Sequence, residues 1–210
     1  MRRLVAALAA AVAIGAGAFA EEKVSVTFDD LPEGMPPAGF SFGVTGKGDA
    51  GAWVVREKAL AQTSTDNTDY RFPVAIYEGG AWKDLTVSVR LKPISGEVDR
   101  AGGIIFRARD ENHYYVVRAN ALEDNVRFHR VVEGRRKMLS GKNLKVTPDE
   151  WHTLAIAAEG TRFTVWFDGE KAIEATDGTF PDAGRVGLWT KADAVTLFDD
   201  LTIEAGGTSR

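Results

Sequence analysis

The amino-acid sequence predicts an all-β protein whose antiparallel strands form a two-sheet sandwich or a barrel. The first observation is period-two alternation, which is clearest in residues 85–91, where Leu and Val alternate with Thr, Ser and Arg. The second is that turn signals containing glycine separate such runs at short intervals. The third is that no amphipathic run of helical period follows the one helix-start pattern in the chain.

The first 20 residues are predicted to be a cleavable signal peptide rather than part of the fold. Two arginines follow the initial methionine, residues 4–19 are apolar or small and uncharged, and Ala18-Phe19-Ala20 fits a small-x-small cleavage site. The run is short and rich in alanine, which makes it a poor membrane span. We therefore expect residues 21–210 to form one exported domain, periplasmic or secreted, with no membrane span after cleavage.

Alternating runs follow one another along the rest of the chain. Besides residues 85–91, strands are expected at residues 104–109, 126–129, 154–158, 163–167, 186–190 and 195–203. The dipeptide Asp168-Gly169 between two of them predicts a tight hairpin. A capping-box pattern at Thr147–Glu150 predicts one helical turn before a core-facing Trp151. Phe28–Leu31 and Phe198–Leu201 share the sequence FDDL, which suggests that the first and last strands lie side by side.

The composition limits the class of partner. Without residues 1–20 the chain loses two of its 26 basic residues and keeps all 30 acidic residues, so its net charge moves from −4 to −6. Domains that bind nucleic acid usually carry a basic excess, so we expect no nucleic-acid partner. The chain has no cysteine, which excludes a disulfide framework, a cysteine-ligated metal and thiol chemistry.

A series of strand motifs resembles one family in order and in spacing. The motifs are Gly103–Asp110, Asn112–Arg118, Arg127–Gly134, Trp151–Leu154, Phe167–Glu170, Gly184–Trp189 and Phe198–Leu201. They are similar to the strands of 3-keto-disaccharide hydrolase-like and laminin G-like domains, over roughly Lys23 to Glu204. The resemblance implies a two-sheet antiparallel jelly-roll β-sandwich of the concanavalin A-like type. It implies little about activity, because such sandwiches include lectins, glucanases, lyases and non-catalytic modules.

Common catalytic patterns are weak in this sequence. A retaining glucanase needs two carboxylates about 5 Å apart, which alternate positions of one strand supply. The only Glu-x-Asp after residue 20 is Glu97-Val98-Asp99, and its position beside Ser95-Gly96 predicts a solvated loop. Residues 46–51 spell a dinucleotide-binding pattern, but a strand-like run follows them instead of a helix, so we expect a plain loop.

Metal ligands are sparse as well. The three histidines, His113, His129 and His152, show no short metal-ligand spacing, and we expect them to be surface or packed strand residues. A structural calcium ion is the one cofactor considered, because carboxylates and carbonyl oxygens of paired terminal strands can hold it. The candidate ligands are Asp29, Asp30, Asp199 and Asp200, and the alternative is that they are ordinary turn aspartates.

Strand alternation predicts a polar sheet face. If Phe106, Val117, Phe128 and Leu188 face the core, their neighbours point the other way. The residues predicted on that face are Arg107, Arg109, Arg118, Asn120, Arg127, His129, Trp189 and Lys191. An aromatic ring can stack on a sugar, arginine or asparagine can hydrogen-bond its hydroxyls, and several arginines favour a carboxylate or sulfate on it. The alternative is a solvated face with paired charges.

Three functions remain open from the sequence. The leading hypothesis is a non-catalytic carbohydrate-binding domain that holds a glycan, preferably an anionic one, on this concave face. The family resemblance implies an enzyme as the alternative, a hydrolase or lyase acting on 3-keto-glycosides, usually with a metal; a uronate lyase would also use arginine, histidine and tyrosine. The third hypothesis is a structural module that binds another protein.

Overall fold

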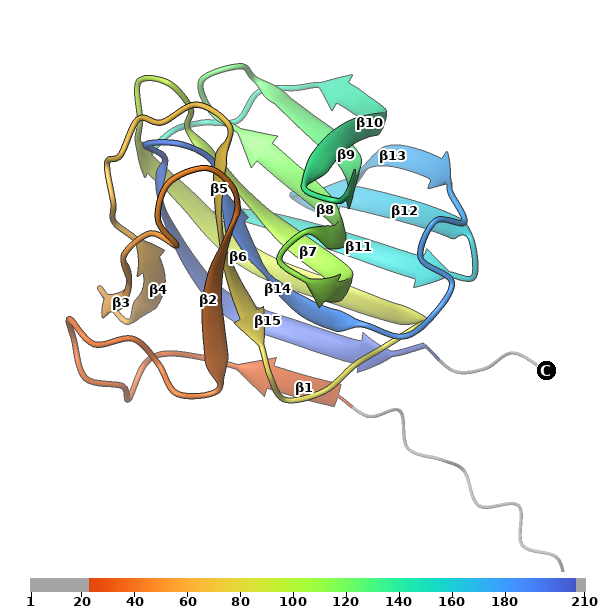
Figure 1. Cartoon of the computed structure of the whole chain (residues 1–210), viewed down its shortest axis with the longest axis horizontal. Helices are drawn as coiled ribbons and strands as arrows, with labels where there is room; N and C mark the ends of the chain where they lie inside the picture. Colours follow the sequence, from red (N-terminus) through yellow and green to blue (C-terminus); the bar gives the residue numbers. More distant parts are fainter. Residues whose placement is uncertain (1–22, 207–210) are drawn as a thin grey trace, which may run out of the picture.

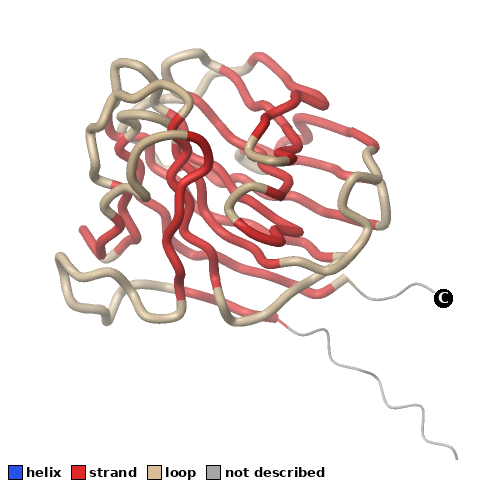
Figure 2. Tube along the Cα trace, in the orientation of Figure 1, coloured by secondary structure: helices blue, strands red, loops and turns tan. Residues whose placement is uncertain are grey.

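The computed structural model describes residues 23–206, and within them all regular secondary structure is β-strand. Fifteen strands form two antiparallel sheets that pack face to face (Figure 1 and Figure 2). The predicted all-β jelly-roll sandwich is confirmed, whereas the predicted signal peptide lies outside the described residues. No helix in the described part of the chain is long and apolar enough to cross a membrane.

The two sheets differ in size. The eight strands of sheet A are β1 (Lys23–Val26), β3 (Trp53–Arg56), β4 (Ala59–Gln62), β6 (Leu85–Ser95), β11 (His152–Glu159), β12 (Arg162–Phe167), β13 (Glu170–Thr176) and β15 (Val195–Ala205). The seven strands of sheet B are β2 (Phe40–Gly46), β5 (Arg71–Tyr77), β7 (Ala101–Asp110), β8 (His113–Asn120), β9 (Asn125–Val132), β10 (Arg135–Asn143) and β14 (Arg185–Thr190). Sheet A runs in the order β13-β12-β11-β6-β15-β4-β3, and sheet B in the order β10-β9-β8-β7-β14-β5-β2.

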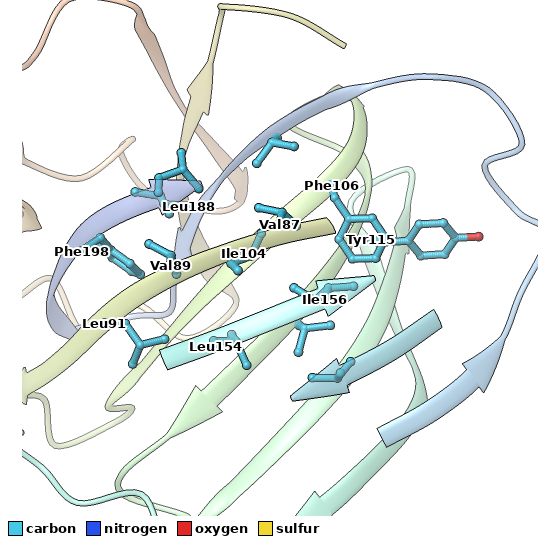
Figure 3. Packing of buried hydrophobic residues seen from close by; sticks show 14 of the residues in the cluster. Val87, Val89, Leu91, Ile104, Phe106, Tyr115, Leu154, Ile156, Leu188 and Phe198 are labelled. Atoms are coloured by element: carbon cyan, nitrogen blue, oxygen red, sulfur yellow. The ribbon is translucent and has the colours of Figure 1, made fainter. Parts of the chain in front are cut away.

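The main core fills the space between the sheets. Phe106, Val117, Phe128 and Leu188 are all fully buried there, as the alternation predicted. Figure 3 shows side chains of both sheets meeting in this layer, with the ring of Tyr115 beside Phe106 and its hydroxyl directed away from the centre. The inner faces of the strands are therefore assigned correctly wherever the alternation is regular.

Two local predictions are also confirmed. Asp168 and Gly169 connect β12 to β13, and their φ angles of 48° and 79° are those of a tight hairpin turn. The first strand, β1, pairs antiparallel with the last, β15, and Val26 lies opposite Leu201. The repeated FDDL sequence therefore marks strands that lie side by side.

Two expectations near residue 150 are wrong. Asp149 has a φ of 60°, which lies outside the right-handed helical region, so residues 147–150 form a turn without helix. Trp151 precedes β11 and is half-buried outside the main core, next to a small cluster on the outer side of sheet A. The guanidinium of Arg90 lies 4.6 Å from its ring centroid. Leu154, three residues later, is the residue that enters the main core.

Candidate functional site

Sheet B curves around its outer face. Tyr114 on β8 and Thr45 on β2 have three strands between them, yet their hydroxyl oxygens are 2.7 Å apart. In a flat sheet the same residues would be about 19 Å apart, since neighbouring strands are about 4.8 Å apart. Tyr70 makes a second bridge, because its hydroxyl donates to the Gly134 carbonyl and accepts from the Arg136 amide in the β9–β10 hairpin. The outer face of sheet B is therefore concave, and this concave face is called the hollow below.

A second hydrophobic cluster, here called the outer cluster, fills part of this hollow. Its members are Phe72, Val74, Ile76, Ala101, Ile105, Ala108, Tyr114, Val116, Val131 and Trp189. The Trp189 ring stacks on Phe72 with centroids 5.4 Å apart, and the Arg136 guanidinium lies 5.8 Å from its centroid. Trp189 is on the predicted face but 0% exposed, so the prediction that it stacks on a sugar is wrong. Tyr70, 39% exposed, is an accessible aromatic residue whose ring packs edge-on against Phe72, with centroids 4.9 Å apart.

The predicted positions of Arg107 and Arg109 are also wrong, because β7 contains a bulge. The register of β7 against β8 shifts between Phe106 and Asp110, and Arg107 has a φ of 47°. A bulge places two successive residues on the same side of a strand. Phe106 and Arg107 therefore both point inward, Ala108 points outward, and Arg109 returns to the inner side.

The side chain of Arg107 is held by backbone carbonyl groups and does not line the outer face. Its Nε donates to the Lys83 carbonyl at 2.7 Å, Nη1 to the Phe180 carbonyl at 3.0 Å and Nη2 to the Gly160 carbonyl at 2.8 Å. The guanidinium also lies 5.3 Å from the ring centroid of Phe163, a main-core residue. Arg107 thus ties three loops together at one edge of the sandwich.

Six other polar side chains form a network, here called the polar cluster, where β8 turns into β9. They are Asp99, Arg118, Asn120, Glu123, Asn125 and Lys191. Arg118 donates to the Asn125 amide oxygen and, at 2.8 Å, to the Glu123 carboxylate. Asp99 accepts from Lys191 at 2.8 Å and from Asn120 at 3.1 Å. Arg118, Asn120 and Lys191 are therefore together, as the sequence predicted.

Residues 97–99 form a loop, as predicted, in which Glu97 and Val98 are exposed, but Asp99 is not solvated. Asp99 is 2% exposed, and the Asp193 carboxylate accepts the backbone amides of Glu97, Val98 and Asp99. Burial raises the pKa of Asp99 above its ordinary value, against the opposing effect of Lys191. The sequence missed Asp99 because nothing near it shows that a distant aspartate, Asp193, folds the loop inward.

Glu123 is the accessible carboxylate of the polar cluster, with a side chain 47% exposed. Partial burial alone would raise the pKa of Glu123, but hydrogen bonds from Asn125 and Arg118 and the charge of Arg118 lower it. Glu123 therefore stays ionised and can accept hydrogen bonds from hydroxyl groups. It follows Asn120 in a turn whose geometry the strand pattern did not reveal.

Three basic residues adjoin the polar cluster on the same face. Arg127 lies directly opposite Arg118 in the β8–β9 register, and its Nη2 donates to the Asn143 amide oxygen at 2.7 Å. His129, 7% exposed, follows on β9. Burial, and next the charges of Arg136, Arg118 and Arg127, lower the pKa of His129 to about 3. The imidazole is thus neutral at ordinary pH. Arg136 was missed because the run of basic residues 135–137 shows no alternation.

The expected calcium ligands do not form a metal site. Burial, and next the charges of Asp200 and Asp29, raise the pKa of Asp199, so these carboxylates are neighbours. However, the Arg90 guanidinium occupies their vicinity, 3.1 Å from Asp200 and 4.0 Å from Asp199, and Asp30 is exposed. Within residues 23–206 no three His, Asp or Glu side chains are arranged to hold a metal ion. The aspartates are charge partners of Arg90 and turn residues.

Two glycine-rich patterns in the sequence do not have the structure of the motifs that they resemble. Residues 46–51 follow the end of β2 as a loop that leads into β3, as predicted, without a helix. Gly39–Gly43 spells Gly-x-Ser-x-Gly, but Ser41 lies within strand β2 and its hydroxyl donates to Glu78. A nucleophile elbow requires a sharp strand-to-helix turn at the serine, so this run is not one.

Comparison with known proteins adds a family and a fold. A family model described as 3-keto-alpha-glucoside-1,2-lyase-like domain matches residues 38–204. The levanase of Bacillus subtilis (strain 168) is 26% identical over 133 residues, which are 62% of this chain and 19% of that protein. The chain thus spans less than a fifth of the length of that relative.

Several solved structures are similar to this chain over most of its length. The carbohydrate-binding module CBM66 from Bacillus subtilis has a TM-score of 0.68 at 21% identity, covering 83% of this chain and 100% of that one. Lectin II from Ulex europaeus has a TM-score of 0.63 at 13% identity, with coverage of 88% and 99%. The β-glucanase of Bacillus licheniformis has a TM-score of 0.60 at 12% identity, with coverage of 87% and 98%. These likenesses establish the fold.

Proposed function

This chain belongs to the 3-keto-alpha-glucoside-1,2-lyase-like domain family, and we propose that it is an exported carbohydrate-binding domain that holds a glycan in the hollow of sheet B. The observation that carries the proposal is the polar cluster, in which charged and amide side chains are fixed on a concave face. The similarity to a carbohydrate-binding module over that module's whole length supports the same function.

The polar cluster suits sugar hydroxyls because it presents both donors and acceptors. Glu123 accepts hydrogen bonds, whereas Arg118 and Lys191 only donate. Their partners Asn125 and Asp99 hold these side chains in place before a ligand arrives, which reduces the entropy lost on binding. Tyr70 offers a ring for the apolar face of a sugar, and its φ of 59° is a strained conformation of the kind found in ligand sites.

The charge of the hollow favours an acidic glycan over a neutral one. Arg118, Arg127, Arg136 and Lys191 line it, against the carboxylates of Asp99 and Glu123. A basic excess on one face of a net acidic protein attracts anions selectively. The expected ligands are therefore glycans with carboxylate or sulfate groups.

A glycan array followed by titration calorimetry tests the proposal. The array includes levan, because the curated relative is named levanase. Arg118→Ala and Glu123→Gln are expected to weaken binding about tenfold or more, because each removes a charge-assisted hydrogen bond. Arg109→Ala, which points away from the hollow, is the matched control and retains affinity. The absence of binding to every glycan on the array would refute the proposal.

A second candidate function is elimination at a 3-keto-α-glucoside. It is favoured by one observation, that Asp99 and Glu123 belong to one charge network and have pKa values moved in opposite directions. Burial raises the pKa of Asp99, whereas hydrogen bonds and the charge of Arg118 lower the pKa of Glu123, and an acid and a base of one site need such a separation. Incubation with a 3-keto-α-glucoside, with product release followed by chromatography, tests it. Turnover that Asp99→Asn abolishes while glycan binding persists would favour the enzyme.

A further inference from the structure

Three basic residues at the β9–β10 side of the hollow are arranged around one point. Arg127 and His129 project from β9 on the same face because they are two residues apart. Met138 of β10 lies opposite His129, and Arg136 lies opposite Val131. Arg136 is thus the diagonal neighbour of His129, at a spacing that long side chains bridge.

The guanidiniums of Arg127 and Arg136 have no carboxylate within 4.0 Å among the described residues. Arg127 donates to the neutral Asn143 amide at 2.7 Å, and Arg136 lies over Phe72, 4.8 Å from its ring centroid. Most other arginines in residues 23–206 have carboxylate partners. Examples at 3.5 Å or less are Arg56–Glu57, Arg71–Asp49, Arg90–Asp200, Arg107–Asp84, Arg109–Asp182, Arg130–Asp177 and Arg185–Glu78. Among residues 23–206, Arg100 and Arg135 also have no carboxylate within 4.0 Å, so four arginines share this lack. Two of the four, Arg127 and Arg136, act together on His129.

A glycine keeps the side chain of Arg127 close to the sheet. A Cβ at Gly141, opposite Arg127 on β10, would lie 2.5 Å from the Arg127 Cδ and 2.9 Å from its Nη1. Glycine inside a strand weakens it and often marks close approach of another group. Gly141 therefore makes room for the arginine side chain against the sheet.

His129 is the second, independent sign of a ligand. It is 93% buried, and its Nδ1 has no hydrogen-bond partner within the described residues. Buried polar atoms are normally paired, and exceptions often have a functional reason. The charged groups that act on His129 are Arg136, Arg118 and Arg127, with Glu123 as the one opposing carboxylate. An anion at this point would offset the positive potential that the neutral imidazole now experiences.

We propose that Arg127, His129 and Arg136 form an oxyanion subsite, which binds a carboxylate or sulfate group on the glycan. This deepens the proposed function and rests on it. The two guanidiniums donate paired N–H groups to the oxygens of the anion, a geometry that suits carboxylate and sulfate alike. The neighbouring polar cluster binds hydroxyl groups of the same sugar chain. The acidic and the neutral groups of the glycan are therefore bound by adjacent sets of side chains.

Calorimetry with matched oligosaccharides tests the subsite on the full chain. The probes are tetragalacturonate, its methyl ester and a sulfated carrageenan tetrasaccharide, with levan as an uncharged glycan. Tetragalacturonate is expected to bind at least about tenfold more tightly than its methyl ester, because the ester cannot form charge-assisted bonds. Arg127→Gln and Arg136→Gln each reduce this preference about tenfold. Arg135→Gln, an exposed neighbour with the same change in charge, leaves it within about twofold.

A second measurement follows His129 itself by NMR. An anion next to an imidazole favours its charged form and raises its pKa. The pKa of His129 is therefore expected to rise from about 3 when the acid is bound and to stay unchanged with the methyl ester. A merely structural role of the arginines would not produce this difference.

The outcomes separate the two proposals. Equal affinity for acid and ester, or binding of levan alone, overturns the oxyanion subsite and leaves the carbohydrate-binding function intact. A preference for carrageenan over tetragalacturonate supports the subsite with sulfate as the source of the charge. Failure of every glycan to bind overturns both proposals.

Discussion

Replacing Arg107 by alanine is expected to destabilise the protein strongly, in contrast to an outward-facing arginine. The side chain is 1% exposed and donates to three carbonyl oxygens, those of Lys83, Gly160 and Phe180. A hydrogen bond that involves a charged group contributes about 1.5–3 kcal/mol, so even at the lower value the three together contribute about 4–5 kcal/mol. The truncation also leaves the carboxylate of Asp84, which lies 3.4 Å from Nη2, without its cation.

Urea denaturation followed by tryptophan fluorescence measures this loss. Arg109→Ala is the matched control, because the Arg109 side chain is 51% exposed and its carboxylate partner, Asp182, is exposed as well. Its effect is expected to stay within about 0.5 kcal/mol. Arg107→Lys retains the charge, but a single nitrogen cannot take the positions of the three nitrogens that donate in Arg107, so its stability should fall between those of the two alanine variants. A loss below about 1 kcal/mol for Arg107→Ala would mean that the bulge in β7 does not turn this side chain inward.

Three further predictions concern the hollow. Trp189→Ala should cost about 3–5 kcal/mol in thermal unfolding, as large buried truncations do; a negligible cost would contradict its burial. His129 has a folded pKa of about 3, below its ordinary value of 6.5. As the pH drops, the unfolded chain therefore takes up this proton before the folded chain does. The free energy of unfolding is highest above pH 6.5 and falls by roughly 4–5 kcal/mol as the pH drops towards 3. His129→Gln should reduce the pH dependence of the free energy of unfolding between about pH 6.5 and 4.5. Equal pH dependence in the variant and the unchanged protein would contradict the prediction. Asp193→Ala frees the amides of residues 97–99 and should cost about 2–3 kcal/mol and weaken glycan binding, which calorimetry would detect; unchanged stability would mean that this loop does not depend on Asp193.

Regular strands could be predicted from the sequence because a side chain's direction depends only on its parity within the strand. That rule places Phe106, Val117 and Leu188 in the main core, and Arg118 outside it. It fails at Arg107, because one extra residue in a bulge reverses the direction of every side chain that follows in the strand. Nothing local in the sequence marks that bulge.

The content of the hollow could not be predicted from single strands either. The burial of Trp189 follows from the curvature of sheet B and from contacts with residues more than 50 positions away along the chain, Phe72 and Arg136. Likewise, Asp99 is buried because Asp193 folds its loop inward. Both are long-range effects, which a period-two pattern does not encode.

The contacts that hold Arg118 and Arg127 in place have a consequence for binding as well as for stability. Arg118 and Arg127 each carry about 2 kcal/mol of side-chain entropy when free. In this protein Arg118 is held by Glu123 and Asn125, and Arg127 by Asn143 and the close approach of Gly141. That entropy is therefore lost during folding and is not lost again when a glycan binds. Weakening these supports should reduce affinity even where the residues that contact the sugar remain unchanged.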